Sequence, residues 1–429
     1  MLVSTLLLCG IAQAAIVPPQ VVFAPFPHDL TAEGRYAVDE AILTVLQTHS
    51  DPVAAMVALD PDSEALLAEP RLLHVRGEET AQWRTEGDKL RLRRQGRKFV
   101  DITDHAEFYA LHKDDHDEPN LPELAHQRLV KPLFAHVETQ RMEHVLRHMT
   151  SYYNRYYADI HGERSSEWLH DHIAEIIASS PFGTHISLEY FPHPFRQSSI
   201  IARFEPKTRN FSLPLTVIGA HQDSANYLFP LLPAPGADDD CSGTVSNLEA
   251  FRILAESGYT PKNGPVEFHW YAAEEGGELG SQDVARYKKE QGAHIGAMIQ
   301  FDMTAFIARN ATEIIAVIST ETNEALTNWT LNLSKEYISI PSEMHPFGAA
   351  GSSDHAQYTR LGYPATFACE GNPMAGVFPG DFDPYIHGVH DTMDIDDQAG
   401  YFSLDHMARF TELAIAFAVE QAGWDNTWR

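Results

Sequence analysis

The sequence predicts an α/β fold: a three-layer sandwich with a mostly parallel central sheet, preceded by a small α+β domain. Short apolar runs, such as residues 215–220 and 266–273, are typical of buried strands. The stretches between such runs carry apolar residues at every third position, as at Val245, Leu248, Phe251 and Leu254. That spacing is typical of a helix that packs one face on a sheet. Strands that alternate with helices favour a largely parallel sheet covered on both faces.

The chain begins with MLVSTLLLCGIAQAA, a short apolar run that ends in small residues. This pattern predicts a signal peptide over residues 1–14, cleaved after Ala14, and a secreted or periplasmic protein. No stretch is both long and apolar enough for an integral membrane span. After cleavage two cysteines would remain, Cys241 and Cys369. Two cysteines are too few for a disulfide scaffold, so the fold must depend on its core and on any bound metal.

Residues 15–130 combine Pro-rich, strand-like and charged pieces with little helical periodicity. We expect them to form the small α+β domain, joined by an acidic linker at 112–120 to a second domain over residues 131–429. Seven Lys and Arg residues fall between Arg84 and Lys98, although the whole chain has a net charge of −29. This basic run is either a solvated strand edge or a contact with an acidic face. The overall negative charge argues against nucleic acid as a partner.

The second domain shows its elements in alternating order. A long helical pattern is predicted around residues 140–157. Buried strands are predicted at 215–220, 266–273, 297–303, 313–318 and 364–368. Amphipathic helices are predicted after residue 242 and over 280–292, 321–338 and 403–421.

Acidic residues and histidines follow several of these apolar runs directly. His221 and Asp223 follow the first run, Glu274 and Glu275 the second, and Asp302 comes at the end of the third. Two more clusters, PGADDDCSG (235–243) and IHGVHDTMD (386–394), lie in loops. Residues that follow the parallel strands of such a sheet gather at the carboxyl ends of the strands. Any one cluster alone would be ordinary surface charge or a helix cap, but gathered carboxylates repel unless a cation lies between them. Imidazole and carboxylate groups are ligands for Zn²⁺.

Five motifs, GAHQDS, PGADDDCSG, YAAEEGGELGS, QFDMT and IHGVHDT, carry a resemblance in this order and spacing. The chain resembles the secreted bacterial and fungal leucine aminopeptidases of the M28 metallopeptidase family over roughly residues 135–425. The resemblance implies a zinc exopeptidase of the phosphorylase/hydrolase-like fold. In the resembled enzymes a propeptide precedes the catalytic domain, and residues 15–130 stand in that place.

The resemblance also implies roles for individual residues. His221 and Asp302 would bind one Zn²⁺, Glu275 and His387 a second, and Asp239 would bridge the two. Glu274 would be the general base that takes a proton from the attacking water and passes it to the leaving amine. Asp223 would orient the His221 ring, and Asp391 would act similarly near His387.

The resemblance places a substrate pocket at five apolar residues: Met303, Phe367, Cys369, Phe382 and Ile386. An apolar pocket implies preference for leucine or another hydrophobic first residue, although such residues beside strands are also ordinary core. Residues 345–358 contain no Cys, and no Tyr ahead of Ser353, so a Tyr that stabilises the oxyanion in some relatives is absent. The loop 370–385 is longer than in close relatives, and we expect it to form a rim or lid over the pocket.

These observations predict a two-zinc aminopeptidase that acts on peptides. Two alternatives on the same fold stay open: a carboxypeptidase or other amidohydrolase, and a glutaminyl cyclase. The short EEGGELGS favours the peptidase over the cyclase. A binding domain without catalysis is disfavoured, because all five ligands and the base are present. The sequence leaves the oligomeric state open and is compatible with a monomer.

Overall fold

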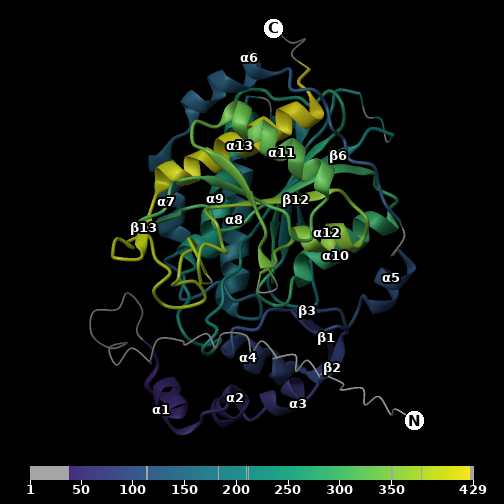
Figure 1. The fold of residues 1–429 in the computed structure, drawn as a ribbon. Helices are drawn as coiled ribbons and strands as arrows, with labels where there is room; N and C mark the ends of the chain where they lie inside the picture. The colour runs from purple at the N-terminus through teal and green to yellow at the C-terminus, as the bar shows by residue number, and fades with distance from the viewer. Residues whose placement is uncertain are drawn as a thin grey trace, which may run out of the picture.

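The computed structural model describes residues 38–425, apart from 113–114, 182, 209, 211, 349–350 and 378. The predicted signal peptide, residues 1–14, lies outside the described residues. The described chain forms an α/β sandwich around one large sheet, with a small N-terminal unit at one end of it (Figure 1). No helix in the described part has the length and apolar character needed to cross a membrane.

The central sheet has eight strands in the order β11-β10-β12-β8-β6-β7-β5-β4. Their bounds are β4 Ile186–Phe191, β5 Ser199–Phe204, β6 Leu215–His221, β7 Val266–Tyr271, β8 Ile295–Phe301, β10 Ile315–Ile318, β11 Ser342–His345 and β12 Ala365–Cys369. The four strands β12, β8, β6 and β7 run parallel to their neighbours within that group. All four are buried along their whole length, as strands covered on both faces must be. The predicted mostly parallel sheet is therefore confirmed.

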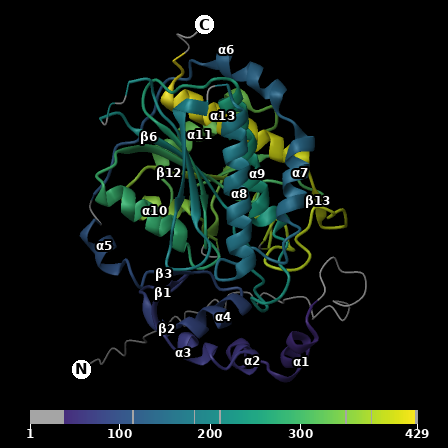
Figure 2. The same ribbon diagram turned by 180° about the vertical axis from the view of Figure 1, so that it is seen from behind.

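Helices cover both faces of the sheet, as Figures 1 and 2 show from opposite sides. One face carries α7 (Thr139–Met149), α8 (Ile160–Ser179), α9 (Gly243–Glu256), α11 (Glu324–Tyr337) and α13 (Leu404–Ala422). The other carries α10 (Leu279–Glu290) and α12 (His355–Arg360). Shorter elements complete this unit: α6 (Gln127–Val130), η1 (Lys131–His136), η2 (Gly183–His185), η3 (Ala237–Ser242), β9 (Phe306–Ala308) and β13 (Gly400–Phe402).

One predicted helix is wrong in extent. The pattern around residues 140–157 continues only to Met149, where α7 ends. The chain then turns, and Arg155 points inward and donates to the carbonyls of Gln222 and Gly236, at 2.8 Å each. A separate helix, α8, starts after Asp159, whose carboxylate accepts the His161 N–H and caps it.

The N-terminal unit combines helices with a three-stranded antiparallel sheet of order β2-β1-β3. Its elements are α1 Glu40–Thr48, α2 Pro52–Leu59, α3 Ser63–Leu67, β1 Pro70–Val75, β2 Gln82–Thr85, α4 Glu86–Arg94, β3 Phe99–Asp101 and α5 Ala106–Leu111. The unit lies at the end of the sheet where the parallel strands finish (Figure 1). The Asp101 N–H, for example, donates to the carbonyl of Gly277, which follows β7, at 3.3 Å.

Candidate metal centre

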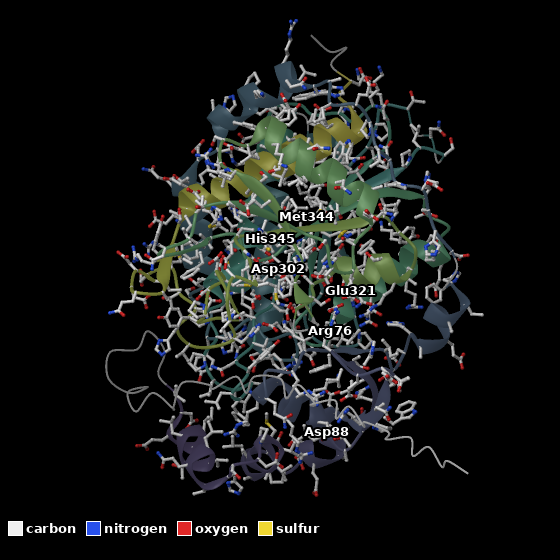
Figure 3. The ribbon with its side chains drawn as sticks, in the orientation of Figure 1. Arg76, Asp88, Asp302, Glu321, Met344 and His345 are labelled. Atoms are coloured by element: carbon white, nitrogen blue, oxygen red, sulfur yellow. The ribbon has the colours of Figure 1, made fainter. Side chains whose placement is uncertain are left out.

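The candidate ligands come together where neighbouring parallel strands end. His221 is the last residue of β6, Glu275 follows β7, and Asp302 follows β8 directly. Because β6 pairs with both β7 and β8, these three ends are adjacent. Asp239 lies in η3, between β6 and α9, and His387 comes from the long loop after β12. Figure 3 shows Asp302 between the sheet and the N-terminal unit, which carries Arg76 and Asp88.

Asp239 lies between two groups of ligands. Its Oδ1 is 3.1 Å from His221 Nε2, which in turn is 3.6 Å from Asp302 Oδ1. Its Oδ2 is 2.8 Å from His387 Nε2, which is 3.5 Å from Glu275 Oε1. The two oxygens of one carboxylate therefore face two different histidines. A carboxylate that bridges two cations requires this arrangement.

The buried polar atoms at this centre fit a divalent metal. Nε2 of His221, Nε2 of His387 and Oδ1 of Asp302 have no hydrogen-bond partner among the described residues. A buried polar atom without a well-formed hydrogen bond costs about 1–3 kcal/mol, and a cation between these histidine nitrogens and the facing carboxylate oxygens would remove that cost. The donor set of imidazole nitrogens and carboxylate oxygens is one that Zn²⁺ favours.

Asp240 also lies close to His221 and Asp302. Its carboxylate is already used, however: Oδ2 accepts the N–H of His221 at 3.1 Å, and Oδ1 accepts those of Gly243 and Met303 at 2.8 and 3.1 Å. Asp240 therefore holds the backbone of the site together, and Asp239 is the residue left to contact a metal.

The charges of the site shift the pKa values of its carboxyl groups in opposite directions. Burial alone would raise the pKa of Asp239, but His387 and His221 outweigh it and hold that pKa well below its usual range. Burial raises the pKa of Glu274 well above its usual range, and the ammonium of Lys98 opposes the shift. A buried carboxyl group with raised proton affinity beside a metal-binding cluster suits general base chemistry.

Asp223 positions the two glutamates that follow β7. Its two carboxylate oxygens accept the backbone N–H groups of Glu274 and Glu275, at 3.0 and 3.1 Å. Its Oδ1 also lies 3.3 Å from His221 Nδ1. Ala273 turns the chain just before the pair with a left-handed φ of 55°. Asp223 thus connects the end of β6 to the turn after β7.

Asp391 holds the backbone of the bridging carboxylate. Its two oxygens accept the N–H groups of Asp238 and Asp239, at 2.7 and 3.1 Å. The sequence predicts that Asp391 orients His387, but its carboxylate is bonded to the backbone of η3 instead.

One residue at the site, Tyr227, was not expected from the sequence, and Lys98 belongs to the basic run for which a contact with an acidic face is one of two expectations. Tyr227 donates its hydroxyl to Glu275 Oε2 at 2.6 Å and stacks on the ring of His387. Lys98, from the N-terminal unit, places its Nζ 3.7 Å from a carboxylate oxygen of Glu274 and of Glu275. The basic run 84–98 was a signal for Lys98, whereas nothing in the sequence around Tyr227 points to the metal centre.

A small apolar cavity opens beside Asp239 and Asp302, with a volume of about 40 Å³. Its apolar lining residues are Met303, Phe347, Phe367, Phe382 and Ile386, and Lys98 forms another part of its wall. Cys369 packs in the same apolar cluster but does not line the cavity. Phe382 and Ile386 come from the long loop after β12, which therefore forms one side of the cavity.

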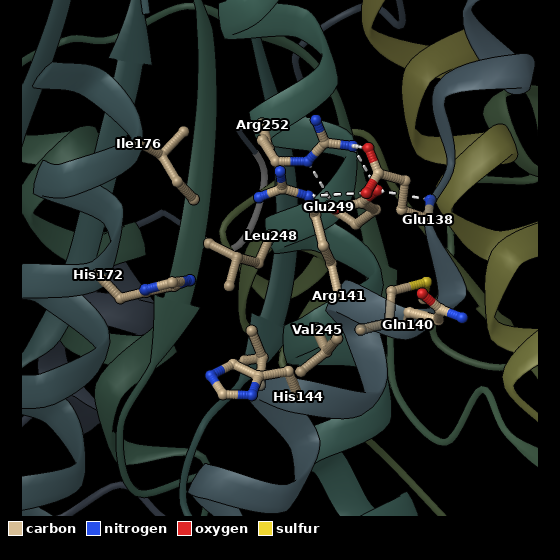
Figure 4. Close-up of a pocket in the computed structure, with 12 residues that line it drawn as sticks. Glu138, Gln140, Arg141, His144, His172, Ile176, Val245, Leu248, Glu249 and Arg252 are labelled. Atoms are coloured by element: carbon tan, nitrogen blue, oxygen red, sulfur yellow. Dashed lines mark hydrogen bonds and ion pairs between the residues drawn. The ribbon is translucent and has the colours of Figure 1, made fainter. Parts of the chain in front are cut away.

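A separate cavity of about 330 Å³ lies between α7, α8 and α9 (Figure 4). Its lining includes His144, His172 and Val245, and the ion pair of Arg252 with Glu249 lies at its edge. None of the predicted site residues lines it. The chemistry expected from the sequence therefore belongs to the smaller cavity at the strand ends.

Comparison with known proteins agrees with the geometry. Residues 199–413 match peptidase family M28, a range that contains all five candidate ligands and Glu274. Leucine aminopeptidase 1 of Chaetomium globosum is 39% identical over 355 residues, which cover 80% of this chain and 83% of that protein. A probable aminopeptidase of Saccharomyces cerevisiae is 37% identical over 370 residues, covering 83% and 94%. Among solved structures, the LapA aminopeptidase of Legionella pneumophila matches with a TM-score of 0.71 and 26% identity, covering 84% of this chain and 100% of that one.

Proposed function

Because the chain belongs to peptidase family M28 and is a metal-dependent aminopeptidase, we propose that it works with two zinc ions bridged by Asp239. His221 and Asp302 would hold one ion, and Glu275 and His387 the other. The observation that carries the proposal is the bridging position of Asp239, whose oxygens lie 3.1 and 2.8 Å from two different histidine nitrogens. The carboxypeptidase and cyclase alternatives are not favoured, since the three similar proteins described above are all named aminopeptidases.

Two bound zinc ions would supply Lewis acidity that polarises the scissile carbonyl and acidifies water. The residues of this chain then have separate tasks. Glu274 accepts the proton of the attacking water and delivers it to the leaving amine. Asp223 fixes the backbone of Glu274 through an N–H bond of 3.0 Å, so that the base stays beside the ligand Glu275.

The apolar cavity would receive the side chain of the first residue of the peptide. Phe347, Phe367 and Phe382 form its aromatic walls. Such a pocket favours leucine or another hydrophobic side chain over a charged one, because a charge would lose its hydration there. Leucine is also the residue in the name of the Chaetomium globosum relative.

The test uses hydrolysis of a leucine chromogenic amide, zinc content, and the variant Glu274→Ala. We expect activity that a chelator abolishes, two zinc ions per chain, and a variant that keeps both ions but loses activity. An amino-acetylated substrate is the matched control and should not be cleaved. Cleavage of the blocked substrate at the rate of the free one would contradict exopeptidase action at the amino end, and an active Glu274→Ala would exclude Glu274 as the base.

The N-terminal unit would keep this site closed until it is displaced or cleaved. The buried guanidinium of Arg93 donates to the carbonyl of Glu275, with Nε at 2.9 Å, and so anchors α4 on the turn that carries the base. Lys98 follows α4 and reaches the carboxylates of Glu274 and Glu275. Lys98 also forms part of the wall of the small cavity, so the N-terminal unit narrows the space beside Asp239 and Asp302.

Cleavage within residues 112–120 tests this role. We expect the cleaved protein, freed of its N-terminal fragment, to hydrolyse the leucine amide faster than the intact chain. In the intact chain Lys98→Ala should raise activity. Arg84→Ala is the matched control, because Arg84 pairs with Glu78 inside the N-terminal unit, at 2.7 Å, and should leave activity unchanged. Equal activity before and after cleavage would remove the inhibitory role.

Residues 1–14 would direct export and be removed, in line with the small residues that end the apolar run. Sequencing the amino terminus of protein recovered outside the cell tests this. A terminus at Ala15 supports the assignment, whereas an uncleaved Met1 contradicts it.

A further inference from the structure

A single aromatic side chain, Tyr227, contacts two candidate ligands of the same metal. Its hydroxyl donates to Oε2 of Glu275 at 2.6 Å, while the other oxygen of that carboxylate, Oε1, faces His387. Its ring lies on the His387 ring, with centroids 3.8 Å apart and planes 8° from parallel. Tyr227 is 5% exposed, so neither contact has water as a ready competitor.

Tyr227 also holds the backbone of His387. The Tyr227 N–H donates to the His387 carbonyl at 3.0 Å. His387 has a left-handed φ of 60°, a conformation that is strained for any residue but glycine and that persists only where its surroundings impose it. Tyr227 therefore fixes both the ring and the main chain of this histidine.

The loop that carries Tyr227 is itself held in place. Asn226 accepts the Leu228 N–H at 3.0 Å and donates to the Pro233 carbonyl at 2.8 Å, which closes the loop on itself. On its outer side Phe229 and Leu232 are buried against helices α1 and α2. The hydroxyl of Tyr227 is thus presented from a rigid support.

The other metal position has different support. His221 and Asp302 are at the ends of β6 and β8, and Asp240 accepts N–H groups from His221 and from Met303, next to Asp302. The side-chain contacts of Tyr227 are with Glu275 and His387 and not with these two ligands. Asp239 and Asp223 contact both metal positions, but the side-chain contacts of Tyr227 are at one of them.

We propose that Tyr227 is a positioning residue for the metal held by Glu275 and His387, and that the affinity of this one ion depends on it. The hydroxyl occupies one carboxylate oxygen of Glu275 and leaves the other directed at the metal, while the ring prevents the imidazole from turning away. This inference rests on the proposed two-zinc site. Partners that orient metal ligands typically change metal affinity by about 10–100-fold when removed.

The test is a zinc titration of metal-free full-length protein against a competing chromogenic chelator. We expect wild type to bind two ions. Tyr227→Phe should bind one ion as wild type does and the second roughly 10–100-fold more weakly. Tyr153→Phe is the matched control, because Tyr153 donates its hydroxyl to the Leu231 carbonyl of the same loop, at 3.1 Å, and should bind both ions like wild type. Urea unfolding in the presence of chelator checks that each variant is folded.

Two outcomes would overturn the proposal: both ions bound by Tyr227→Phe as tightly as by wild type, or both weakened to the same extent. If wild type binds a single ion, the two-zinc proposal fails separately. In that case an unchanged affinity in Tyr227→Phe overturns the role of Tyr227, and a weakened affinity supports it.

Discussion

Replacement of Arg155 by methionine should destabilise the protein strongly, because this side chain is fully buried and holds one side of the loop between β6 and η3. Its guanidinium donates to three carbonyls, those of Gln222, Pro235 and Gly236. A hydrogen bond to a charged group contributes about 1.5–3 kcal/mol, and each buried carbonyl left unpaired costs about 1–3 kcal/mol. Removing the desolvation cost of the buried charge offsets part of this loss. We therefore expect the free energy of unfolding to fall by about 3–5 kcal/mol.

Urea unfolding of the metal-free protein measures this loss directly. With an unfolding entropy of about 2.1 cal/mol/K per residue, 429 residues give roughly 0.9 kcal/mol/K, so a loss of 4 kcal/mol lowers Tm by about 4 °C. Arg147→Met is the matched control: Arg147 is 53% exposed in its pair with Glu143 and should change stability by less than about 0.5 kcal/mol. A loss below about 1 kcal/mol in Arg155→Met would refute the view that the three carbonyls depend on it.

Three further predictions concern pH, packing and metal. Burial alone would raise the pKa of Asp283, but hydrogen bonds with His105 and His193 hold it below its usual range. The contribution of Asp283 to the free energy of unfolding is therefore complete above its unfolded-state pKa of about 3.9 and is lost as the pH falls towards its lower folded-state pKa. Urea unfolding should show the free energy of unfolding falling from pH 5 to pH 3 in wild type, and falling less in Asp283→Asn. Gly280→Ala should cost about 1–3 kcal/mol and reduce activity, because an added Cβ would lie 2.1 Å from the Ala272 carbonyl oxygen; a melting temperature like that of wild type would contradict this. A bound zinc ion stabilises the folded protein by about 4 kcal/mol when free zinc is at a thousand times its Kd. A chelator removes this stabilisation and should therefore lower the Tm of wild type, but should leave the Tm of Asp239→Asn nearly unchanged.

Strands β6, β7, β8, β10 and β12 were predictable because they are short apolar runs, and the helices α9, α10, α11 and α13 because one face of each is apolar. Strands β4, β5 and β11 of the same sheet were not predicted. Helix α8 was not predicted. Small polar residues, Gly162, Ser165 and Ser166, occupy part of its buried face and hide the apolar period. The turn that separates α7 from α8 was also missed. An arginine in the sequence predicts a surface position, and only the structure shows that Arg155 is buried with three carbonyl partners.

The candidate ligands could be found from the sequence because each motif has a fixed relation to a strand end or a loop, and parallel strands bring those ends together. Tyr227 and Lys98 have no such relation. Tyr227 lies within an apolar loop, where an aromatic residue predicts only packing. Lys98 belongs to a different structural unit, and its approach to Glu274 depends on how that unit docks, which local sequence patterns do not encode.

The loop between β6 and η3 connects the inhibitory role proposed for the N-terminal unit with the support of Tyr227. Removal of that unit would take Lys98 out of the wall of the cavity. It would also expose Phe229 and Leu232 on the loop that carries Tyr227. The inner side of the loop keeps its bonds to Arg155, which comes from the catalytic unit. We therefore expect the protein to retain two zinc ions after cleavage within 112–120 and removal of the N-terminal fragment. Metal analysis of the remaining C-terminal part measures this. Loss of one ion on removal would show instead that α1 and α2 are needed to hold Tyr227, and the N-terminal unit would then be a permanent part of the enzyme.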